Sequence, residues 1–381
     1  MKLGSDVAIL GGGLIGLAIA YELAQRGANV RVFERDEPGR AASWAGAGML
    51  APYTERIGDE PLLQLCAESL SLYPRFVESV QAASGVDVQL HLEGVVNAAF
   101  DDERMHELAS HARELSERGI GCSVLDRKAA LFAAPSLGRP VRGAVVVSGE
   151  GYVDNRRLGR ALTAACESAG VSIVRETEEL AIECDARRVL GVRTHLGFSA
   201  ATHVVVAAGA WSASVPGLPH ACRPPVEPVK GQMLALAAPS GFLKRTTWVP
   251  GAYLVPREDG RLLVGATVER CGFDERVTAA GIRALLDAAL TAAPSLGGFS
   301  VTETWAGLRP GTPDERPVLG PAPLQGLILA TGHYRNGILL TPVTARLIAD
   351  FVASGDASPL APWLLARFER EGAAAERMTR P

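Results

Sequence analysis

The feature that most constrains the fold is a glycine-rich turn near the N-terminus, in the segment DVAILGGGLIGLAIAYELAQRG at 6–27. The apolar run at 7–10 predicts a strand, and the apolar spacing after the turn predicts a helix. Gly11, Gly13 and Gly16 between them form a GxGxxG pattern. The first glycine permits the turn, the second lets the backbone approach a pyrophosphate, and the third lets helix and strand pack closely. The helix N-terminus then faces the phosphates.

A second strand, NVRVF at 29–33, is followed by Glu34, which lies 18 residues after Gly16. A carboxylate at the end of this strand is typical of a group that binds a ribose hydroxyl. It disfavours NADP, because a 2′-phosphate would face a negative charge. The strand, turn, helix and acidic residue therefore predict a dinucleotide site, which these residues alone leave open between NAD and FAD.

Composition narrows the class of protein. The chain has 381 residues, which is long for a single core, so two domains are expected. The net charge is -4 and no lysine/arginine block exists, which argues against nucleic acid and anionic membrane partners. The six cysteines contain no CxxC pair, so we expect reduced thiols and no zinc or other metal site.

The apolar stretch at 7–24 is similar in character to a signal or membrane segment. No small-residue cleavage site follows it, and Glu22 already interrupts it, so the strand–helix interpretation is favoured. We therefore expect a cytoplasmic protein.

Further elements follow from the apolar patterns. The apolar strand 204–206 is typical of a central parallel position, whereas 221–306 predicts mostly antiparallel sheet with a hairpin turn at 258–260. A helix at 61–84 is expected to be interrupted near Pro74, and a last helix is expected to begin at Pro342 after an N-cap at Thr341.

Four separated motifs carry a resemblance to a known family: SWAGAGMLAP at 43–52, YLVPREDGRLLVGAT at 253–267, WAGLRPGTPDERPVLG at 305–320 and GHYRNGILLTP at 332–342. In this order they resemble the glycine oxidase (ThiO) branch of the D-amino acid oxidase family, over nearly the whole chain. The resemblance implies FAD rather than NAD.

The resemblance also implies the architecture. It is an α/β fold with an FAD-binding, Rossmann-like domain of the glutathione-reductase type and a substrate domain with a large antiparallel β-sheet. The FAD-binding domain would be discontinuous, formed by 1–85, 145–220 and 306–381, and the substrate-binding domain would comprise 86–144 and 221–305. A homo-oligomer, a tetramer in such branches, is expected on the same ground.

The implied reaction removes a hydride from the α-carbon of glycine or another small amino acid to flavin N5. Hydrolysis of the imine then gives an oxo acid and ammonia, and O2 reoxidises the flavin to yield hydrogen peroxide. By resemblance the product would serve thiamin thiazole synthesis. The alternatives are an N-methyl amino acid (sarcosine-type) oxidase or D-amino acid dehydrogenase of the same fold, and a flavin-binding module without redox turnover.

Three residues are expected to act on the substrate. Arg309, followed by Pro310, would clamp the substrate carboxylate with two parallel hydrogen bonds. By resemblance Arg335 would be a second cation near that carboxylate or the flavin, unless it pairs with a core carboxylate instead. Tyr253 would place a hydroxyl over the substrate, unless it is a strand tyrosine with a partner of its own.

The motif and the resemblance together assign a set of cofactor-binding residues, with His333 as a flavin contact rather than a general base: Gly11, Gly13, Leu14, Ile15, Gly16, Glu34, Arg35, Ala42, Ser43, Ala47, Gly48, Met49, Val174, Gly209, His333, Tyr334, Arg335, Asn336, Gly337, Ile338 and Leu339. Ala42 departs from the family pattern, which more often has a hydroxyl there. Val268 is small for a wall of the site, which would enlarge the pocket.

Overall fold

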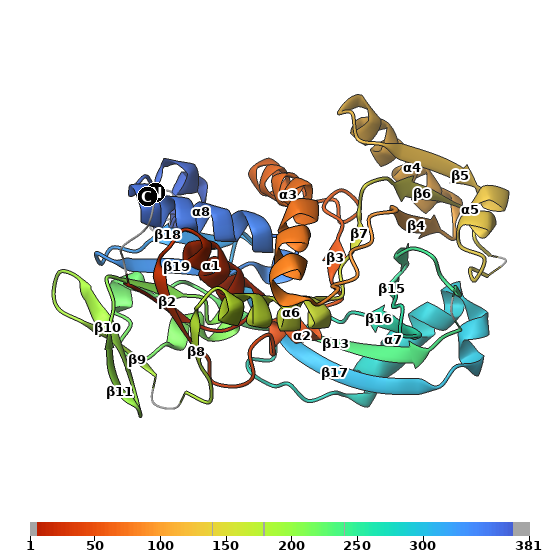
Figure 1. Cartoon of the computed structure of the whole chain (residues 1–381). Coiled ribbons are helices and arrows are strands. Elements are labelled where there is room, and N and C mark those ends of the chain that lie inside the picture. The colour runs from red at the N-terminus through yellow and green to blue at the C-terminus, as the bar shows by residue number, and fades with distance from the viewer. Residues whose placement is uncertain (1–5, 139, 178–179, 240, 369–381) are drawn as a thin grey trace, which may run out of the picture.

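The structure, a computed structural model, describes residues 6–138, 140–177, 180–239 and 241–368. In these residues the strands form two large sheets that lie in different halves of the molecule (Figure 1). The first has six strands in the order β18-β19-β12-β1-β2-β8, all parallel except β18. Their bounds are β1 Asp6–Leu10, β2 Asn29–Phe33, β8 Ser172–Val174, β12 His203–Val206, β18 Val318–Pro321 and β19 Leu327–Thr331.

Alternation along β1 explains the layers on the two faces of this sheet. Val7 and Ile9 pack with the helices α1 Leu14–Gln25, α3 Glu60–Ser84, α6 Asn155–Ser168 and α8 Thr341–Ser354. Ala8 and Leu10 face the other way, toward a small antiparallel sheet of β9 Ala181–Cys184, β10 Val189–Thr194 and β11 Gly197–Ala200. The buried strand predicted at 204–206 is confirmed, because β12 pairs in parallel with both β1 and β19.

The second sheet has eight strands in the order β17-β13-β16-β15-β14-β4-β6-β5. All its pairings are antiparallel except β14 with β4, which confirms the predicted large antiparallel sheet. The bounds are β4 Val95–Ala99, β5 Cys122–Asp126, β6 Gly143–Val147, β13 Glu227–Ala237, β14 Thr247–Val249, β15 Ala252–Pro256, β16 Arg261–Gly265 and β17 Val301–Gly311.

The two faces of the eight-stranded sheet have different neighbours. One face carries Leu234, Leu254 and Val264, and packs against α7 Ala279–Ala292 and α5 Arg127–Ala133. The other face carries Met233, Tyr253 and Trp305, and lies against the segment around α2 Ala42–Ala45, with α4 Asp102–Glu117 near one end. This second face is therefore directed at the first sheet and its glycine turn.

The shorter elements complete the path of the chain. They are β3 Met49–Leu50, β7 Gly151–Tyr152, η1 Gly209–Ser214, η2 His220–Cys222, η3 Pro294–Gly298, η4 Tyr334–Asn336 and η5 Ser358–Trp363. Among the described helices, none combines the length and the apolar character needed to cross a bilayer. All six cysteines are free thiols, as expected.

Three local expectations need correction. Helix α3 continues through Pro74, because the helices packed along it stabilise the turn that a proline weakens. Thr341 is the first residue of α8 rather than its N-cap, and its hydroxyl donates to the Gly337 carbonyl. Helix α7, between 279 and 292, lies in a region whose apolar pattern predicted mostly sheet.

The expected domain boundaries at 145 and 306 fall inside strands. Both β6 and β17 belong to the eight-stranded sheet over their full length. A strand keeps its hydrogen-bonded partners until it ends, so the sheet retains residues up to 147 and from 301 to 311.

Candidate active site

The turn after β1 requires glycine at two positions, because other backbone atoms lie too close to them for a side chain. Gly11 has a φ of 108°, and a Cβ at this position would lie 2.4 Å from the Ala207 carbonyl oxygen. A Cβ on Gly16 would lie 1.9 Å from the Gly11 oxygen, so α1 can pack this closely on β1 only with glycine there. The start of α1, at Leu14 and Ile15, lies in the wall of a cavity beside the turn.

Glu34 lies where β2 ends, and backbone donors fix its carboxylate. One oxygen accepts the Gly12 N–H at 2.6 Å and the other accepts the Asp36 N–H at 2.9 Å. The side chain lines the same cavity as the glycine turn. This placement is the one expected of a residue that binds a ribose hydroxyl.

The small-residue segment around α2 lies across the start of α1. The Ser43 hydroxyl accepts the Leu14 N–H at 3.0 Å, and Asn155 donates to the Ser43 carbonyl at 2.7 Å. The buried Arg257 donates to the Ala47 carbonyl at 2.8 Å, and burial lowers the pKa of this guanidinium to about 10. The segment is therefore held in place by side chains from both halves of the molecule.

The dinucleotide cavity, as we call the space beside the glycine turn, has a volume of about 610 Å³. It extends from Glu34, past the start of α1, to the loop at 331–338. The residues predicted for the cofactor that line it are Gly11, Gly13, Leu14, Ile15, Glu34, Arg35, Ala42, Ser43, Gly209, His333, Tyr334, Arg335, Gly337 and Ile338.

Other residues predicted for the cofactor lie around this cavity. Ala47, Gly48 and Met49 line the neighbouring cavity instead, and Gly16, Asn336 and Leu339 lie behind the lining. Val174 is also outside the lining: its carbonyl accepts the Glu34 N–H at 2.9 Å and the Thr177 hydroxyl at 3.0 Å. The Val174 backbone therefore helps to hold Glu34 and Thr177, two residues that line the cavity.

His333 is a buried neutral group. Its Nε2 lies 3.1 Å from the Thr344 hydroxyl, and burial lowers its pKa to about 3. A ring with so low a pKa is a poor proton acceptor at neutral pH, so the interpretation of His333 as a contact rather than a general base is kept.

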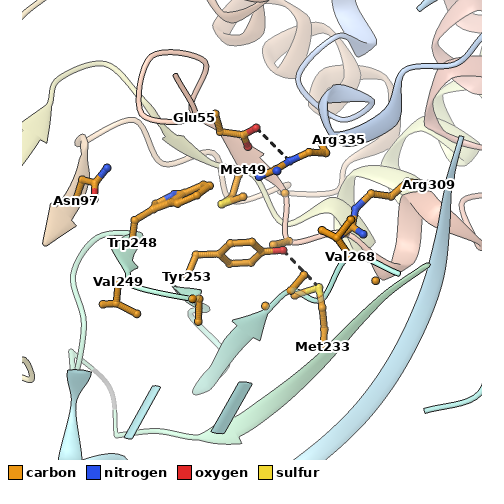
Figure 2. Close-up of a pocket in the computed structure, with 18 of the residues that line it drawn as sticks. Met49, Glu55, Asn97, Met233, Trp248, Val249, Tyr253, Val268, Arg309 and Arg335 are labelled. Carbon is orange, nitrogen blue, oxygen red and sulfur yellow. Dashed lines mark hydrogen bonds and ion pairs between the residues drawn. The ribbon is translucent and has the colours of Figure 1, made fainter. Parts of the chain in front are cut away.

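A second cavity of about 560 Å³ lies over the eight-stranded sheet, and we call it the sheet cavity. The strand register sets a row of side chains along its floor. Asn97 pairs with Trp248, Trp248 with Tyr253, Tyr253 with Gly265, and Gly265 with Met233. Directly paired residues point to the same face, so all of them face the cavity. Figure 2 shows this cavity with its polar side chains.

Arg309 lies where the two cavities meet. Its guanidinium donates to the Thr267 carbonyl at 3.1 Å and lies over Gly231, whose Cβ, if present, would be 2.3 Å from Nη1. The residues that line both cavities are Ala42, Gly46, Arg309, Arg335 and Ile338. A ligand group in the sheet cavity can therefore reach this arginine beside the end of the dinucleotide cavity.

Tyr253 is buried beside Arg309, and its hydroxyl lies 3.8 Å from the Met233 sulfur (Figure 2). A Cβ on Gly265 would lie 2.7 Å from this hydroxyl, so the glycine leaves room for the ring. Burial raises the pKa of Tyr253, so the phenol stays protonated and is able to donate. A thioether is a weak acceptor, which leaves the hydroxyl available for a ligand.

Arg335 faces Glu55, with 3.7 Å between Nε and Oε2 (Figure 2). Arg335 therefore has a carboxylate partner, which is the alternative to a direct role at the substrate or flavin. It also lines both cavities. Burial raises the pKa of Glu55, while the charges of Arg335 and Arg309 act in the opposite direction. Two arginines thus share one carboxylate at the site, and the local charge is positive.

Glu150 holds the segment that precedes Glu55. This fully buried carboxylate accepts the Tyr53 N–H at 2.6 Å, the Thr54 N–H at 3.1 Å and the Thr54 hydroxyl. Burial raises its pKa to about 7. Glu150 lies in the turn between β6 and β7. The eight-stranded sheet therefore helps to position Glu55, the carboxylate that faces Arg335.

A comparison with known families decides the class of protein. Residues 6–351 match the DAO family model, described as FAD dependent oxidoreductase. The chain belongs to this family. The match covers the glycine turn, both large sheets and Arg309, so it includes all of the geometry described above.

Individual relatives agree with the family. The chain is 38% identical to the glycine oxidase of Pseudomonas putida, over 94% of this chain and 98% of that protein. The crystal structure of glycine oxidase from Geobacillus kaustophilus matches with a TM-score of 0.89 at 37% identity, covering 95% of this chain and 98% of that one. A bifunctional ThiO/ThiG protein of Synechocystis is 41% identical over 94% of this chain, which spans about half of that longer protein, 53% of its length.

The dinucleotide cavity of this DAO-family chain fits FAD. Its wall includes the backbone of the glycine turn at Gly11 and Gly13, the start of α1 and the Glu34 carboxylate, which is the arrangement that a dinucleotide cofactor needs. The cavity then continues to the loop that carries His333 and Arg335, beside the sheet cavity.

Sequence reasoning missed several residues of the site: Glu55, Asn97, Glu150, Gly231 and Arg257. Only Gly231 carried a local signal, because a glycine inside a strand pattern often marks close approach of another group. The others are ordinary polar residues whose role depends on what the fold brings near them.

Proposed function

We propose that this chain oxidises glycine and other small amino acids at the α-carbon and releases glyoxylate or another oxo acid, ammonia and hydrogen peroxide. The observation that carries the proposal is Arg309, presented over Gly231 at the junction of the two cavities with Tyr253 beside it. The relatives named glycine oxidase, aligned over nearly their full length, support it.

Each residue has a physical role in this proposal. Arg309 binds the substrate carboxylate through two parallel N–H groups and so fixes the direction of the α-hydrogen. Tyr253, kept protonated by burial, donates to the same carboxylate. Bound FAD supplies the hydride acceptor and its reoxidation by O2.

Arg335 adds positive charge at the junction, which Glu55 partly offsets. A positive field there attracts the carboxylate of the substrate and favours negative charge on the cofactor ring. His333 takes no proton at neutral pH, so the amine must arrive neutral or lose its proton to solvent.

The remaining assignments share this basis. We infer that 1–85, 148–220 and 312–381 form the FAD-binding domain and that 86–147 and 221–311 form the substrate domain, with the boundaries moved to the strand ends. We also propose that the cofactor-binding residues predicted from the sequence contact FAD or hold the segments that do. A role in thiamin thiazole synthesis draws support from the relatives named ThiO/ThiG, and the homo-oligomeric state and cytoplasmic location stay predictions from the resemblance.

The test is anaerobic mixing of the FAD-loaded protein with glycine, sarcosine and D-alanine, followed at the flavin absorption band. Glycine is expected to bleach the band, and Arg309→Ala is expected to slow bleaching at low glycine by about 100-fold or more, since a charged hydrogen-bonded clamp contributes about 3 kcal/mol. Absence of bleaching by all three amines would overturn the proposal.

An aerobic assay separates the alternative activities. Peroxide formed with air as sole electron acceptor identifies an oxidase, whereas a dehydrogenase would require an added quinone or dye. Faster bleaching by sarcosine than by glycine would favour the N-methyl amino acid oxidase.

A further inference from the structure

The floor of the sheet cavity extends well beyond the arginines. From Tyr253 on β15 the paired row continues to Trp248 on β14 and to Asn97 on β4. Neighbouring strands lie about 4.8 Å apart, so Asn97 is about 10 Å from Tyr253 across the sheet. Figure 2 shows Asn97 and Arg309 at opposite sides of the cavity, with Trp248 and Tyr253 between them. Glycine bound at Arg309 would leave this end of the cavity unused.

Asn97 is an unusual residue for the floor of a cavity. Its side chain is only 6% exposed and lines the sheet cavity, and its amide has no hydrogen-bond partner in the part of the chain that the structure describes. The amide atoms are not fully enclosed by protein, so they are open to the cavity that the residue lines. The amide therefore points to a ligand group that enters the cavity and offers both a donor and an acceptor.

The charges at this end oppose a negatively charged ligand group. Asp101 and Arg104, at the start of α4, both line the cavity. Asp101 accepts the Arg104 N–H at 2.7 Å, and the Arg104 guanidinium donates to Glu107 at 2.8 Å. The Arg104 charge is thus paired with Glu107, whereas the Asp101 carboxylate is held by a neutral backbone N–H and keeps the rim negative. An anionic ligand group is therefore disfavoured, and the Asn97 amide, which both donates and accepts, is matched by a neutral carboxamide.

The space between the arginines and Asn97 is suited to an aliphatic chain. Trp248 and Tyr253 form its floor, and the Met49 side chain lies near them (Figure 2). Their rings and thioether present mainly apolar surface, and the Trp248 indole N–H is a buried donor without a partner among the described residues.

We propose that the sheet cavity has a distal subsite, formed at Asn97, for amino acids that carry a long aliphatic substituent ending in an uncharged hydrogen-bonding group such as a carboxamide. The substituent can be attached to the amine or to the α-carbon, and both reach the same subsite. The inference rests on the proposed function, because the same oxidation takes place at the Arg309 end. It names the class of substrate that uses the whole cavity.

The test uses pairs of synthetic substrates with the FAD-loaded enzyme. One member is glycine whose nitrogen carries a pentyl chain ending in a carboxamide, and the other carries the same chain ending in isopropyl, which has a similar shape. We expect kcat/KM for the carboxamide to be about 10-fold higher, equivalent to about 1.4 kcal/mol. The D-amino acids with the same two side chains form the second arm and decide which attachment the cavity accepts.

Variants assign the preference to Asn97. Asn97→Leu should reduce the carboxamide-to-isopropyl ratio about 10-fold, and Asn97→Asp should shift the preference to a chain that ends in an ammonium group. Thr247→Val is the matched control, since Thr247 is a buried polar residue on the adjacent strand whose side chain points to the opposite face. It should leave the ratio unchanged.

The outcomes separate this inference from the proposed function. Glycine oxidation with equal rates for the two tailed substrates, or a ratio that Asn97→Leu does not change, would overturn the subsite alone. Failure of glycine and of every tailed substrate to bleach the flavin would overturn the proposed function as well.

Discussion

The Tyr253 hydroxyl is available to a substrate because the Met233 sulfur, the acceptor that it now faces, is a weak one. This buried hydroxyl lies 3.8 Å from the Met233 sulfur and also faces the Arg309 guanidinium, which can donate to it but cannot accept from it. Thioethers accept hydrogen bonds poorly, so the phenol loses little when it turns to a substrate carboxylate.

For Tyr253→Phe we therefore expect little change in stability, within about 1 kcal/mol, and a 10- to 100-fold loss in kcat/KM for glycine, because a hydrogen bond to a charged group contributes about 1.5–3 kcal/mol. Stopped-flow flavin reduction and thermal melting measure the two effects. Unchanged reduction kinetics would show that the hydroxyl does not contact the substrate.

Arg335 and Glu55 form a second pair whose energetics can be separated. Their distance of 3.7 Å and the partial exposure of the arginine indicate a modest interaction of about 1 kcal/mol. Arg335→Gln should remove the ion-pair partner of Glu55, leave the Arg309 charge beside it, and lower the free energy of unfolding by about that amount; adding Glu55→Gln should restore part of it. Denaturant titration of the two single variants and the double variant measures this coupling, and additive losses would contradict it.

At the scale of elements, β13 and β17 build the clamp together. Gly231 on β13 is paired with Gly307 on β17, and Arg309 follows on the same face two residues later. The long strand carries the arginine, and the glycine in the neighbouring strand leaves room for the guanidinium.

Gly231→Ala would place a Cβ 2.3 Å from Arg309 Nη1 and must displace the guanidinium. We expect KM for glycine to rise at least about 10-fold, since a displaced clamp loses one of its two hydrogen bonds. Gly58→Ala is the control, because nothing lies within 4 Å of a Cβ at that glycine. Equal KM values for both variants would refute the packing argument.

The turn between β6 and β7 contributes a pH-dependent element. Burial raises the pKa of Glu150 from 4.5 to about 7, so the folded state holds this proton more tightly than the unfolded state does. Its contribution to stability is thus complete below the unfolded pKa and is lost as the pH rises through the folded pKa.

The melting temperature of the wild type should therefore fall relative to that of Glu150→Gln as the pH increases from about 5 to about 8. Glu55 remains in both proteins, so the difference between them reports mainly on Glu150. Calorimetry at several pH values measures it, and a difference that is constant with pH would contradict the assignment.

At the scale of the whole molecule, the cofactor joins distant parts of the chain. The dinucleotide cavity is lined by residues near both ends of the sequence, from Gly11 to Ile338, and by the middle segment around Gly209. A ligand bound only by the folded protein stabilises it by about 2.7 kcal/mol at 100 times its dissociation constant.

Removal of FAD should accordingly lower the melting temperature by about 5 °C or more, given about 2–4 °C per kcal/mol in domains of this size. Calorimetry of the loaded and the FAD-stripped protein, with FAD added back to the stripped sample, provides the measurement. Identical melting temperatures would show that the cavity does not hold FAD.

The dinucleotide-binding turn and the course of the main strands could be predicted from the amino-acid sequence alone. A strand, a glycine turn and a helix are local, because positive φ at Gly11, the apolar period and a helix N-terminus are set by neighbouring residues. The arginine in GLRPG was a candidate because the motif around it resembles a family; the structure places Arg309 in the lining of both cavities, and its role as the carboxylate clamp stays a proposal.

The surroundings of those residues could not be predicted in this way, because they depend on how the chain folds. Glu55 and Arg335 meet across a large separation in the chain, Gly231 faces Arg309 because of the β13–β17 register, and Asn97 joins the same floor through β14. A shift of one residue in any of these pairings would turn the side chains to the other face. Register and burial are properties of the whole sheet, so these contacts depend on residues far away in the sequence.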